Sequence, residues 1–346
     1  MIDYDRIRHS YLATENERLV ADNNLVQTMQ PLPQMHSLQM LLPVDMLEPD
    51  YINGNSAIHP IDDGYLVLQR CSNYRIVPAH LRPDQIHTKN VWIALNNDFS
   101  PRAYCDIDHS LVDRISYNPL GRMKIIGLED ARFFEFQDRW WFIAGSNHFE
   151  MPMKGVDRWG QVLCRIHADG ESIDYVRPLR YRHATKVEKN WLPFVMQDTV
   201  YVVYSYAPFI ILRVDTHSGG CDVSYRQMGQ LRFDNYRGSG TPIRYQGKWL
   251  FTIHEVRRVV GHRFIYNHRF VEMDDDFTIT RLSETFYFRH KGVEYTCGHC
   301  LSNDGTKLLL TYSSEDKHAH LLWTPLDVIE SLLHPLDYFQ LDEESV

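Results

Sequence analysis

Most of the chain repeats one pattern, in which a few alternating apolar and polar residues lead into a tight turn and then into a strongly apolar run. In the second copy, residues 131–136 precede the turn at 137–139, and residues 140–144 read Trp-Trp-Phe-Ile-Ala. Two such segments joined by a tight turn are typical of a β-hairpin. The turns of the five copies lie at residues 62–64, 137–139, 197–198, 246–247 and 303–305.

The spacing of these hairpins predicts how they assemble. The turns are about 50–75 residues apart, and further strands such as 210–215 and 270–273 follow the hairpins. Hairpins repeated at this period are typical of a propeller with four-stranded blades. We therefore predict an all-β protein, a five-bladed β-propeller. A pair of β-sandwiches is the alternative architecture, but it explains the regular spacing less well.

The ends of the chain depart from this pattern. Residues 1–50 contain a polar, helix-compatible stretch at 11–24, followed by three prolines within 31–43. Proline interrupts the ladder of a regular sheet, so this part is predicted to lie outside the repeat. The predicted division is an N-terminal arm or cap with some helix (1–50), a five-bladed propeller domain (51–335) and a C-terminal tail (336–346).

Composition supports a folded protein and narrows its partners. The 346 residues are 44% hydrophobic and 23% charged, which is enough apolar surface to bury a core. The net charge of −9 argues against a broad basic surface for nucleic acid. Aromatic residues reach 12% and include 20 Tyr. This excess suits β-strands and also suits a site that stacks on sugar rings.

The chain start and the cysteines predict a reduced, cytoplasmic environment. Charged residues occur at once within residues 1–6, and no apolar run approaches the roughly 18 residues of a membrane helix. The six cysteines are sparse, which favours buried, reduced thiols. The segment Cys297-Gly298-His299-Cys300 looks like half a zinc site, but no second ligand pair accompanies it. We therefore predict neither a metal nor a cofactor.

Polar residues recur at equivalent places in the five copies, near the ends of the predicted innermost strands. These strands converge on the axis of a propeller, where a charged group buried without a partner costs on the order of several kcal/mol. Taken singly, Arg70 suits a salt bridge between blades, His254 a core histidine and Lys189 a surface lysine. As a set, these residues favour a bound polar ligand. The candidate site residues are Asn55, Arg70, Glu129, Asp130, Arg132, Lys189, Asn190, Arg237, His254, Tyr266 and Asp316.

The order of these residues resembles glycoside hydrolase family 130, which contains β-mannoside phosphorylases and β-1,2-mannosidases, and it is similar to glycosyltransferase family 108. The shared elements are an Asn and an Arg fifteen residues apart, then Glu-Asp-x-Arg, Lys-Asn-Trp, Gly-x-Gly-x-Pro and Tyr-x-x-x-Asp. Here they lie at residues 55 and 70, 129–132, 189–191, 238–242 and 312–316. The resemblance covers about residues 53–330 and implies a five-bladed propeller that acts on β-mannosides, with β-1,2 the expected linkage.

Three positions depart from the family pattern. Ala131 replaces the usual Pro of Glu-Asp-Pro-Arg, and Glu255 replaces the Gly that usually follows the histidine of the fourth blade. Arg237 is the nearest cation to the lysine expected before residues 238–242. These differences are typical of an outlying branch and leave the sugar donor open.

The residue types favour phosphate chemistry over hydrolysis. Inverting hydrolysis needs two carboxylates, one acid and one base, roughly 6.5–9.5 Å apart. In the first blade, where the base is expected, the chain has Asn55, and an amide cannot act as a base. Phosphate is already an anionic nucleophile, so a phosphorylase needs one general acid and a cationic cradle. Asp130 is the candidate acid. The candidate cradle is Arg70, Lys189, Asn190, Arg237 and His254.

The protonation of Asp130 is the open point of this mechanism. The resemblance implies that the matching Asp is the catalytic acid and that its proton passes through a sugar hydroxyl. Asp130 must then be protonated before phosphorolysis. A neighbouring Glu129 and a dry funnel would raise its pKa, whereas Arg132 would lower it, and the sequence does not decide between them.

Four further side chains have candidate roles. Asp316 and Tyr266 are predicted to bind sugar hydroxyls or the anion. Trp191 and Tyr206 either stack on a sugar face or belong to the core of a blade.

Three functions are open at this stage. The first is a carbohydrate-active transferase, either a β-mannoside phosphorylase or a mannosyltransferase. Its partners would be a mannoside oligosaccharide with phosphate, mannose 1-phosphate or GDP-mannose. The second is a β-mannoside hydrolase with Glu255 or another carboxylate as the base, and the third is a non-catalytic sugar-binding propeller. The sequence is compatible with a homo-oligomer but does not set the oligomeric state.

Overall fold

The computed structural model describes most of the repeat region and parts of both ends. The described residues are 26–33, 35–40, 42, 50–74, 85–115, 125–147, 149, 159–185, 187–228, 235–259 and 262–339. The helix-compatible stretch predicted at 11–24 lies outside these residues, as does the end of the predicted tail at 340–346.

The described strands form five sheets, which follow one another in chain order. The first sheet consists of β3 (Ile52–Ile61), β4 (Gly64–Ser72), β5 (Ile86–Leu95), β6 (Pro101–Asp106) and β7 (Ile125–Ile126). The second consists of β8 (Glu129–Phe136), β9 (Arg139–Ser146), β10 (Gly160–Ile166) and β11 (Ile173–Pro178). The third consists of β13 (Leu192–Met196), β14 (Thr199–Tyr206), β15 (Phe209–Val214), β16 (Gly220–Gln227) and β12 (Arg180–Tyr181).

The last two sheets also recruit strands from the ends of the chain. The fourth consists of β17 (Tyr236–Gly238), β18 (Ile243–Tyr245), β19 (Lys248–Val259), β20 (His262–Met273), β21 (Ile279–Ser283), β22 (Phe286–Tyr287), β1 (Gln30–Pro31) and β26 (Leu333–Pro335). The fifth consists of β23 (Glu294–Leu301), β24 (Lys307–Ser314), β25 (His318–Pro325) and β2 (His36–Gln39). The short helices are α2 (Ser110–Arg114), α3 (Leu326–Leu332) and the 3₁₀ turn η3 (Leu336–Phe339).

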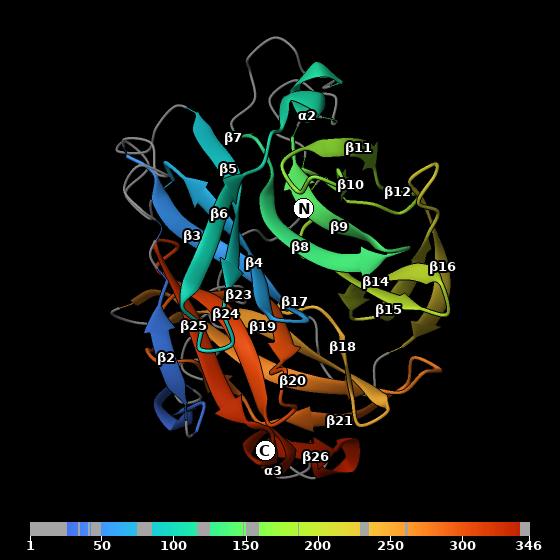
Figure 1. Ribbon diagram of the computed structural model, residues 1–346. Helices are drawn as coiled ribbons and strands as arrows, with labels where there is room; N and C mark the ends of the chain where they lie inside the picture. Colours follow the sequence, from blue (N-terminus) through green and yellow to red (C-terminus); the bar gives the residue numbers. More distant parts are fainter. Residues whose placement is uncertain are drawn as a thin grey trace, which may run out of the picture.

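The five sheets close into a ring (Figure 1). Strand β3 contacts β8, β8 contacts β13, β14 contacts β17, and β20 contacts β23. Strand β23 contacts β3, which joins the last sheet to the first. The all-β, propeller-like arrangement predicted from the repeat is therefore confirmed.

The prediction of five uniform four-stranded blades does not hold in that form. Only two of the described sheets have four strands, and one of these reaches four because β2 from the N-terminal segment pairs with β25. Strand β1 likewise pairs with β22 in the fourth sheet. Added strands cover sheet edges that would otherwise expose unpaired backbone groups. The repeat pattern could not predict them, because they come from outside the repeat.

The predicted hairpin turns are confirmed by strand pairing. Phe136 pairs with Arg139 across a two-residue turn, and Met196 pairs with Thr199 in the same way. The central residues Gln137 and Asp138 have φ of 52° and 54°. Positive φ at both central positions belongs to the turn type whose twist matches that of paired strands. The local sequence thus determines these hairpins.

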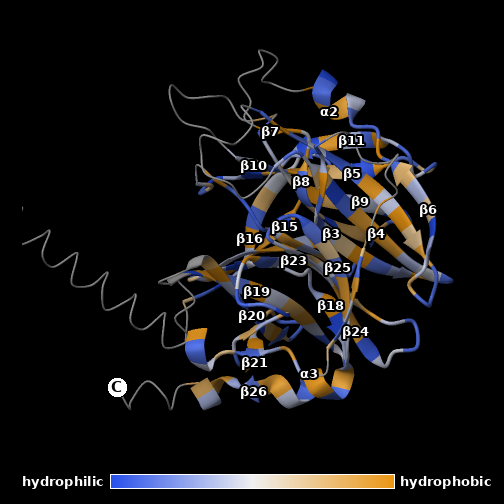
Figure 2. Cartoon of the chain, turned by 90° about the vertical axis from the view of Figure 1, so that its left-hand side faces the viewer, coloured by the Kyte–Doolittle hydropathy of each residue, from blue (hydrophilic) through white to orange (hydrophobic). Residues whose placement is uncertain are grey.

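Apolar side chains from adjacent sheets meet between the blades, and Figure 2 shows hydrophobic residues distributed along the strands. Leu68 and Trp92 of the first sheet pack with Phe133 and Phe142 of the second. Both sheets therefore bury one apolar face against each other, which is the main source of stability in a layered β-fold. None of the described helices is long and apolar enough to span a membrane.

Candidate active site

One cavity gathers the polar residues of all five sheets at one end of the ring. Its volume is about 320 Å³. Ten of the eleven predicted site residues line it, namely Asn55, Arg70, Glu129, Asp130, Lys189, Asn190, Arg237, His254, Tyr266 and Asp316. Polar residues that are far apart in the sequence therefore lie around one cavity. The roles assigned to them remain predictions.

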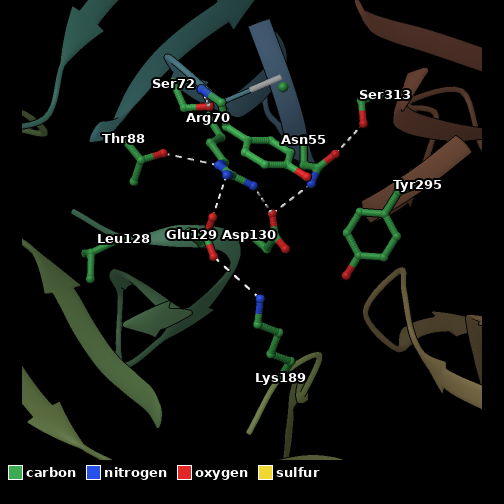
Figure 3. A network of polar contacts seen from close by, with 12 residues as sticks. Asn55, Arg70, Ser72, Thr88, Leu128, Glu129, Asp130, Lys189, Tyr295 and Ser313 are labelled. Carbon is green, nitrogen blue, oxygen red and sulfur yellow. Dashed lines mark hydrogen bonds and ion pairs between the residues drawn. The ribbon is translucent and has the colours of Figure 1, made fainter. Parts of the chain in front are cut away.

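Asp130 is held by one of its two carboxylate oxygens (Figure 3). Its Oδ1 accepts a hydrogen bond from Asn55 Nδ2 at 2.8 Å and another from Arg70 Nη1 at 2.8 Å. None of the described residues donates a hydrogen bond to Oδ2. Ser313 donates to Asn55 Oδ1, which orients the amide so that its nitrogen faces Asp130. One oxygen of Asp130 is therefore fixed, and the other is available to a ligand.

A β-bulge explains why two consecutive carboxylates line the same cavity. Side chains alternate between the two faces of a regular strand, so neighbours would point apart. The β8–β9 ladder shifts register between Glu129 and Arg132, and Asp130 has a φ of 51°. A bulge re-aims side chains in this way and is common beside active sites. Here it allows Glu129 and Asp130 to face the cavity together.

The pKa of Asp130 answers the question that the sequence left open. Burial raises this pKa, but the charge of Arg70, the Asn55 hydrogen bond and the more distant charges of Arg132 and Lys189 together lower it. The result is a pKa below the usual value for an aspartate. Asp130 is therefore ionised at neutral pH, and the neighbouring cations outweigh the dry surroundings.

Arg132 does not line the main cavity, contrary to the predicted binding role. It is buried beneath the cavity, where Nε donates to Ser239 O at 3.0 Å and Nη1 donates to Asp130 O at 2.9 Å. Its Nη2 donates to the Tyr295 hydroxyl, which in turn donates to Asn190 Oδ1 at 2.6 Å. Arg132 therefore links β8 to Ser239 and to Tyr295 of β23, and through Tyr295 to Asn190.

The predicted cationic cradle is only partly available. The Nε, Nη1 and Nη2 atoms of Arg70 donate to Thr88 Oγ1, Asp130 Oδ1 and Glu129 Oε1 at 3.1, 2.8 and 2.5 Å. Arg70 is thus committed to protein carboxylates. By contrast, the exposed Arg237 side chain forms no ion pair with any described residue.

Lys189 and His254 are two further residues of the predicted cationic cradle. Lys189 Nζ lies 3.7 Å from Glu129 Oε2 and 3.9 Å from the centre of the Trp159 ring, so its charge is only partly compensated. His254 is buried, and desolvation with nearby cationic groups lowers its pKa well below the usual value. A neutral His254 offers hydrogen bonds but no charge. Among the described cradle residues, Lys189 and Arg237 are therefore the two cations whose charge is not fully compensated by protein carboxylates.

Asp316 is the third carboxyl group of the cavity, and its environment differs from that of Asp130. Desolvation raises its pKa to about 6, and the nearby carboxylates Asp130 and Glu129 add to the effect, while Arg70 opposes it. Its φ of 52° lies in the left-handed region. The two aspartates thus have pKa values pushed in opposite directions within one cavity.

The sequence did not identify three aromatic residues that line the cavity, Tyr74, Trp159 and Tyr295. Tyr295 lies near the start of β23, at a place equivalent to Asp130 in β8, so comparison between blades could have found it. Trp191 and Tyr206, the predicted stacking candidates, are core residues instead. Trp191 is 1% exposed and donates to Glu188 Oε2 at 3.0 Å.

Two other candidates from the sequence lie away from the cavity. Glu255, the candidate base of a hydrolase, is buried and paired with Arg257 Nη2 at 2.5 Å. His299, between the two cysteines of the Cys-x-x-Cys segment, is buried with its ring nitrogens 3.2 Å from Leu250 O and from Thr252 Oγ1. Within the described ranges, no three His, Cys, Asp or Glu side chains are grouped so as to hold a metal ion.

Comparison with known proteins identifies the fold. No family model matches the sequence, and no curated protein matches it. A β-1,2-mannobiose phosphorylase from Listeria innocua, solved with β-1,2-mannobiose, superposes with a TM-score of 0.54 at 12% identity, over 86% of this chain and 99% of that one.

Two structures from Leishmania mexicana are also similar. MPT-4, a mannose phosphorylase solved with phosphate, has a TM-score of 0.53 at 11% identity, covering 80% of this chain and 85% of that one. MPT-1, a GDP-Man-dependent mannosyltransferase, has a TM-score of 0.56 at 9% identity, covering 89% and 94%. At these identities the likeness concerns the fold, and it supports the all-β, propeller-like arrangement.

Proposed function

We propose that this chain is a carbohydrate-active transferase that moves a mannosyl group between an anionic mannose donor and a mannoside acceptor, with inversion at the anomeric carbon. The donor is mannose 1-phosphate or GDP-mannose, and the product is a β-mannoside. A β-1,2 linkage is proposed because the similar phosphorylase from Listeria innocua is named for it.

The observation that carries this proposal is the arrangement of charge in the cavity. The carboxylate of Asp130 is anchored through Oδ1. Lys189 and Arg237 line the same cavity, and their positive charges are not fully compensated by protein carboxylates. An anchored, ionised carboxylate beside a cationic pair matches the needs of phosphate-linked glycosyl transfer, in which the anion is the leaving group or the nucleophile. A sugar-binding propeller without catalysis would not need this carboxylate in a strained bulge.

The lowered pKa of Asp130 favours the synthetic direction. An ionised carboxylate is suited to act as a general base, whereas phosphorolysis must begin with this group protonated. In synthesis, Asp130 accepts the proton of the acceptor hydroxyl as that oxygen attacks the anomeric carbon. The bond from this carbon to the donor phosphate breaks, and the phosphate leaves with the electron pair. Lys189 and Arg237 then stabilise the charge that develops on the leaving group.

Hydrolysis is less well supported. Glu255, the base proposed for it, is paired with Arg257 and does not line the cavity. Asp316 does line the cavity, and with a pKa raised to about 6 it is mostly ionised near neutral pH. We assign Asp316 to sugar hydroxyls, because an ionised carboxylate accepts hydrogen bonds from them.

The experiment is a donor screen with the full chain. Mannose 1-phosphate or GDP-mannose is incubated with mannose or a mannoside, and the release of phosphate or GDP is measured together with the oligosaccharide products. The expected result is donor-dependent release matched by an equal amount of β-mannoside. Release of phosphate and GDP at the background rate from both donors, or sugar hydrolysis in phosphate-free buffer without transfer, would exclude the proposal.

A further inference from the structure

A small chamber lies behind the carboxylates of the main cavity. Its volume is about 10 Å³, close to the smallest space that holds one water molecule. Glu129 and Asp130 form its front, and Gly145, Trp159 and Gln161 form part of its walls. These wall residues come from β9, the residue before β10, and β10 itself.

Two buried polar atoms at this chamber have no hydrogen-bond partner among the described residues, and they are of opposite kinds. Trp159 Nε1 is a donor, and Gln161 Oε1 is an acceptor. Gln161 is only 3% exposed. Leaving such an atom unpaired costs about 1–3 kcal/mol, and buried polar atoms in native proteins are nearly always satisfied by protein or by ordered water.

The two atoms cannot be satisfied by turning the Gln161 amide. Its Nε2 donates to Glu188 O at 3.0 Å and lies 3.5 Å from Gly160 O. If the amide were turned, its oxygen would face these two carbonyl oxygens. No hydrogen bond could then form, because all three oxygens are acceptors. The acceptor of Gln161 is therefore held in its present orientation, and a third group that donates to it and accepts from the indole N–H would satisfy both atoms.

Gly145 keeps the necessary space open. A Cβ atom at this position would lie 3.2 Å from Trp159 Nε1 and 3.5 Å from Gln161 Nε2. Gly145 also pairs with Glu129 in one ladder and with Gln161 in the other. A side chain here would enter the space beside both polar groups.

We infer that the chamber is a binding site for one structural water molecule. This water accepts the N–H of Trp159, donates one hydrogen to Gln161 Oε1 and offers the other to Glu129. Glu129 Oε2 lies 3.7 Å from Lys189 Nζ, which is too long for a hydrogen bond. The water thereby braces Glu129, which holds Arg70, which holds Asp130. This positioning role rests on the proposed function, but the water site does not.

The site is tested by high-resolution crystal structures of the full chain and of Gly145→Ala. The expected result is one density peak in the parent, about 2.7–3.2 Å from both Trp159 Nε1 and Gln161 Oε1, that is lost in the variant. A parent structure in which the indole N–H bonds directly to a protein oxygen, or in which the chamber holds no peak, would overturn the inference.

Kinetics test the positioning role separately. Gly145→Ala is expected to lower kcat roughly tenfold, since small misplacements of a catalytic group have large effects on rate, with the acceptor KM unchanged. Trp159→Phe is also expected to lower kcat, but it alters a residue that lines the main cavity, so its KM is expected to change as well. Trp140→Phe is the matched control, because it also removes an indole N–H but lies outside both spaces. A water lost from Gly145→Ala with normal kcat would remove the positioning role. A parent without transferase activity would refute the proposed function and leave the density result to decide the water site.

Discussion

Two cavities lie along the same innermost strands, and they differ in character although they are similar in size. The candidate site, of about 320 Å³, is lined by Asn55 on β3 and Asp130 on β8. The second cavity, of about 340 Å³, is lined further along these strands by Ile58 on β3 and by Phe133 on β8. Strand β23 likewise contributes Tyr295 to the first and residues 299–301 to the second.

The difference follows the regularity of strand pairing. The β3–β4 ladder shifts register between residues 53 and 56, the β8–β9 ladder between 129 and 132, and the β23–β24 ladder between 296 and 298. All three irregularities lie at the polar end, and pairing beyond them is regular. Bulges free side chains from strict alternation. In these three ladders, pairing is irregular at the polar end, where functional groups face the cavity, and regular at the apolar end, where side chains are buried in the core.

The strongest test of this difference between the two cavities is to neutralise one carboxylate at each end of β8. Asp130→Asn should lower kcat by roughly 10²–10⁴-fold, as expected for the loss of a general base, with folding intact. Glu135→Gln is the matched control, since Glu135 lies on the same strand and lines the second cavity. Rates from the donor screen check both variants. A near-normal rate in Asp130→Asn would remove Asp130 from the mechanism.

A substitution at the apolar end should have the opposite effect. Phe194 is 2% exposed and packs with Trp249 and Phe277. Phe194→Ala should lower the free energy of unfolding by about 3–5 kcal/mol, while kcat per folded molecule stays at the parent value. Urea unfolding and the donor screen measure the two quantities. A large loss of kcat in the folded variant would show that the two ends are coupled.

Each of the two cavities is lined by one arginine that allows a second test of this difference. Arg237 lines the polar cavity, whereas Arg244 lines the apolar one and pairs with Asp275 at 2.7 Å. Arg237→Gln should raise the KM for mannose 1-phosphate roughly 10–100-fold, because a charge-assisted hydrogen bond is lost. The KM of the neutral acceptor should not change, and Arg244→Gln should leave both constants unchanged. Equal losses for donor and acceptor would assign Arg237 a structural role.

The smallest expected effect concerns pH and Asp316. The pKa of this carboxyl is raised to about 6 in the folded protein, chiefly by burial, from an ordinary value of 3.8. The folded state therefore holds its proton more tightly, and the protein loses stability as the pH rises from about 4 to about 6. Asp316→Asn avoids this loss, so its Tm should exceed that of the parent by a few degrees at pH 7.5.

The same Tm difference should shrink at pH 4, where the parent carboxyl is protonated in the folded state. Thermal unfolding of both proteins across this range makes the measurement. A Tm difference that does not change with pH would mean that Asp316 is not destabilised by ionisation.

Much of the fold was predictable because hairpins are local. Two-residue turns such as Gln137-Asp138, between runs of apolar residues, are readable from neighbouring positions alone. The pairing of β2 with β25 was not readable, because it joins segments almost 290 residues apart and nothing local distinguishes this partner from another sheet edge.

The candidate site was predictable as a set but not in its internal roles. Asp130 and Arg237 occupy equivalent blade positions, and the geometry of a propeller brings such positions together. Whether a cation meets a ligand or a protein carboxylate depends on distances across blades. Arg70 was predicted for the cradle and is committed to Glu129 and Asp130, while Trp191 was a stacking candidate and is core.

The sequence by itself determined the hairpins, the all-β class and the list of polar residues that converge on the axis, since each of these depends on local pattern and on its repetition. Only the tertiary structure decided the ionisation of Asp130, the commitment of Arg70 and the place of Arg132 below the cavity. Ionisation and pairing depend on the solvent exposure and the through-space charges around a group, and the folded chain alone sets both.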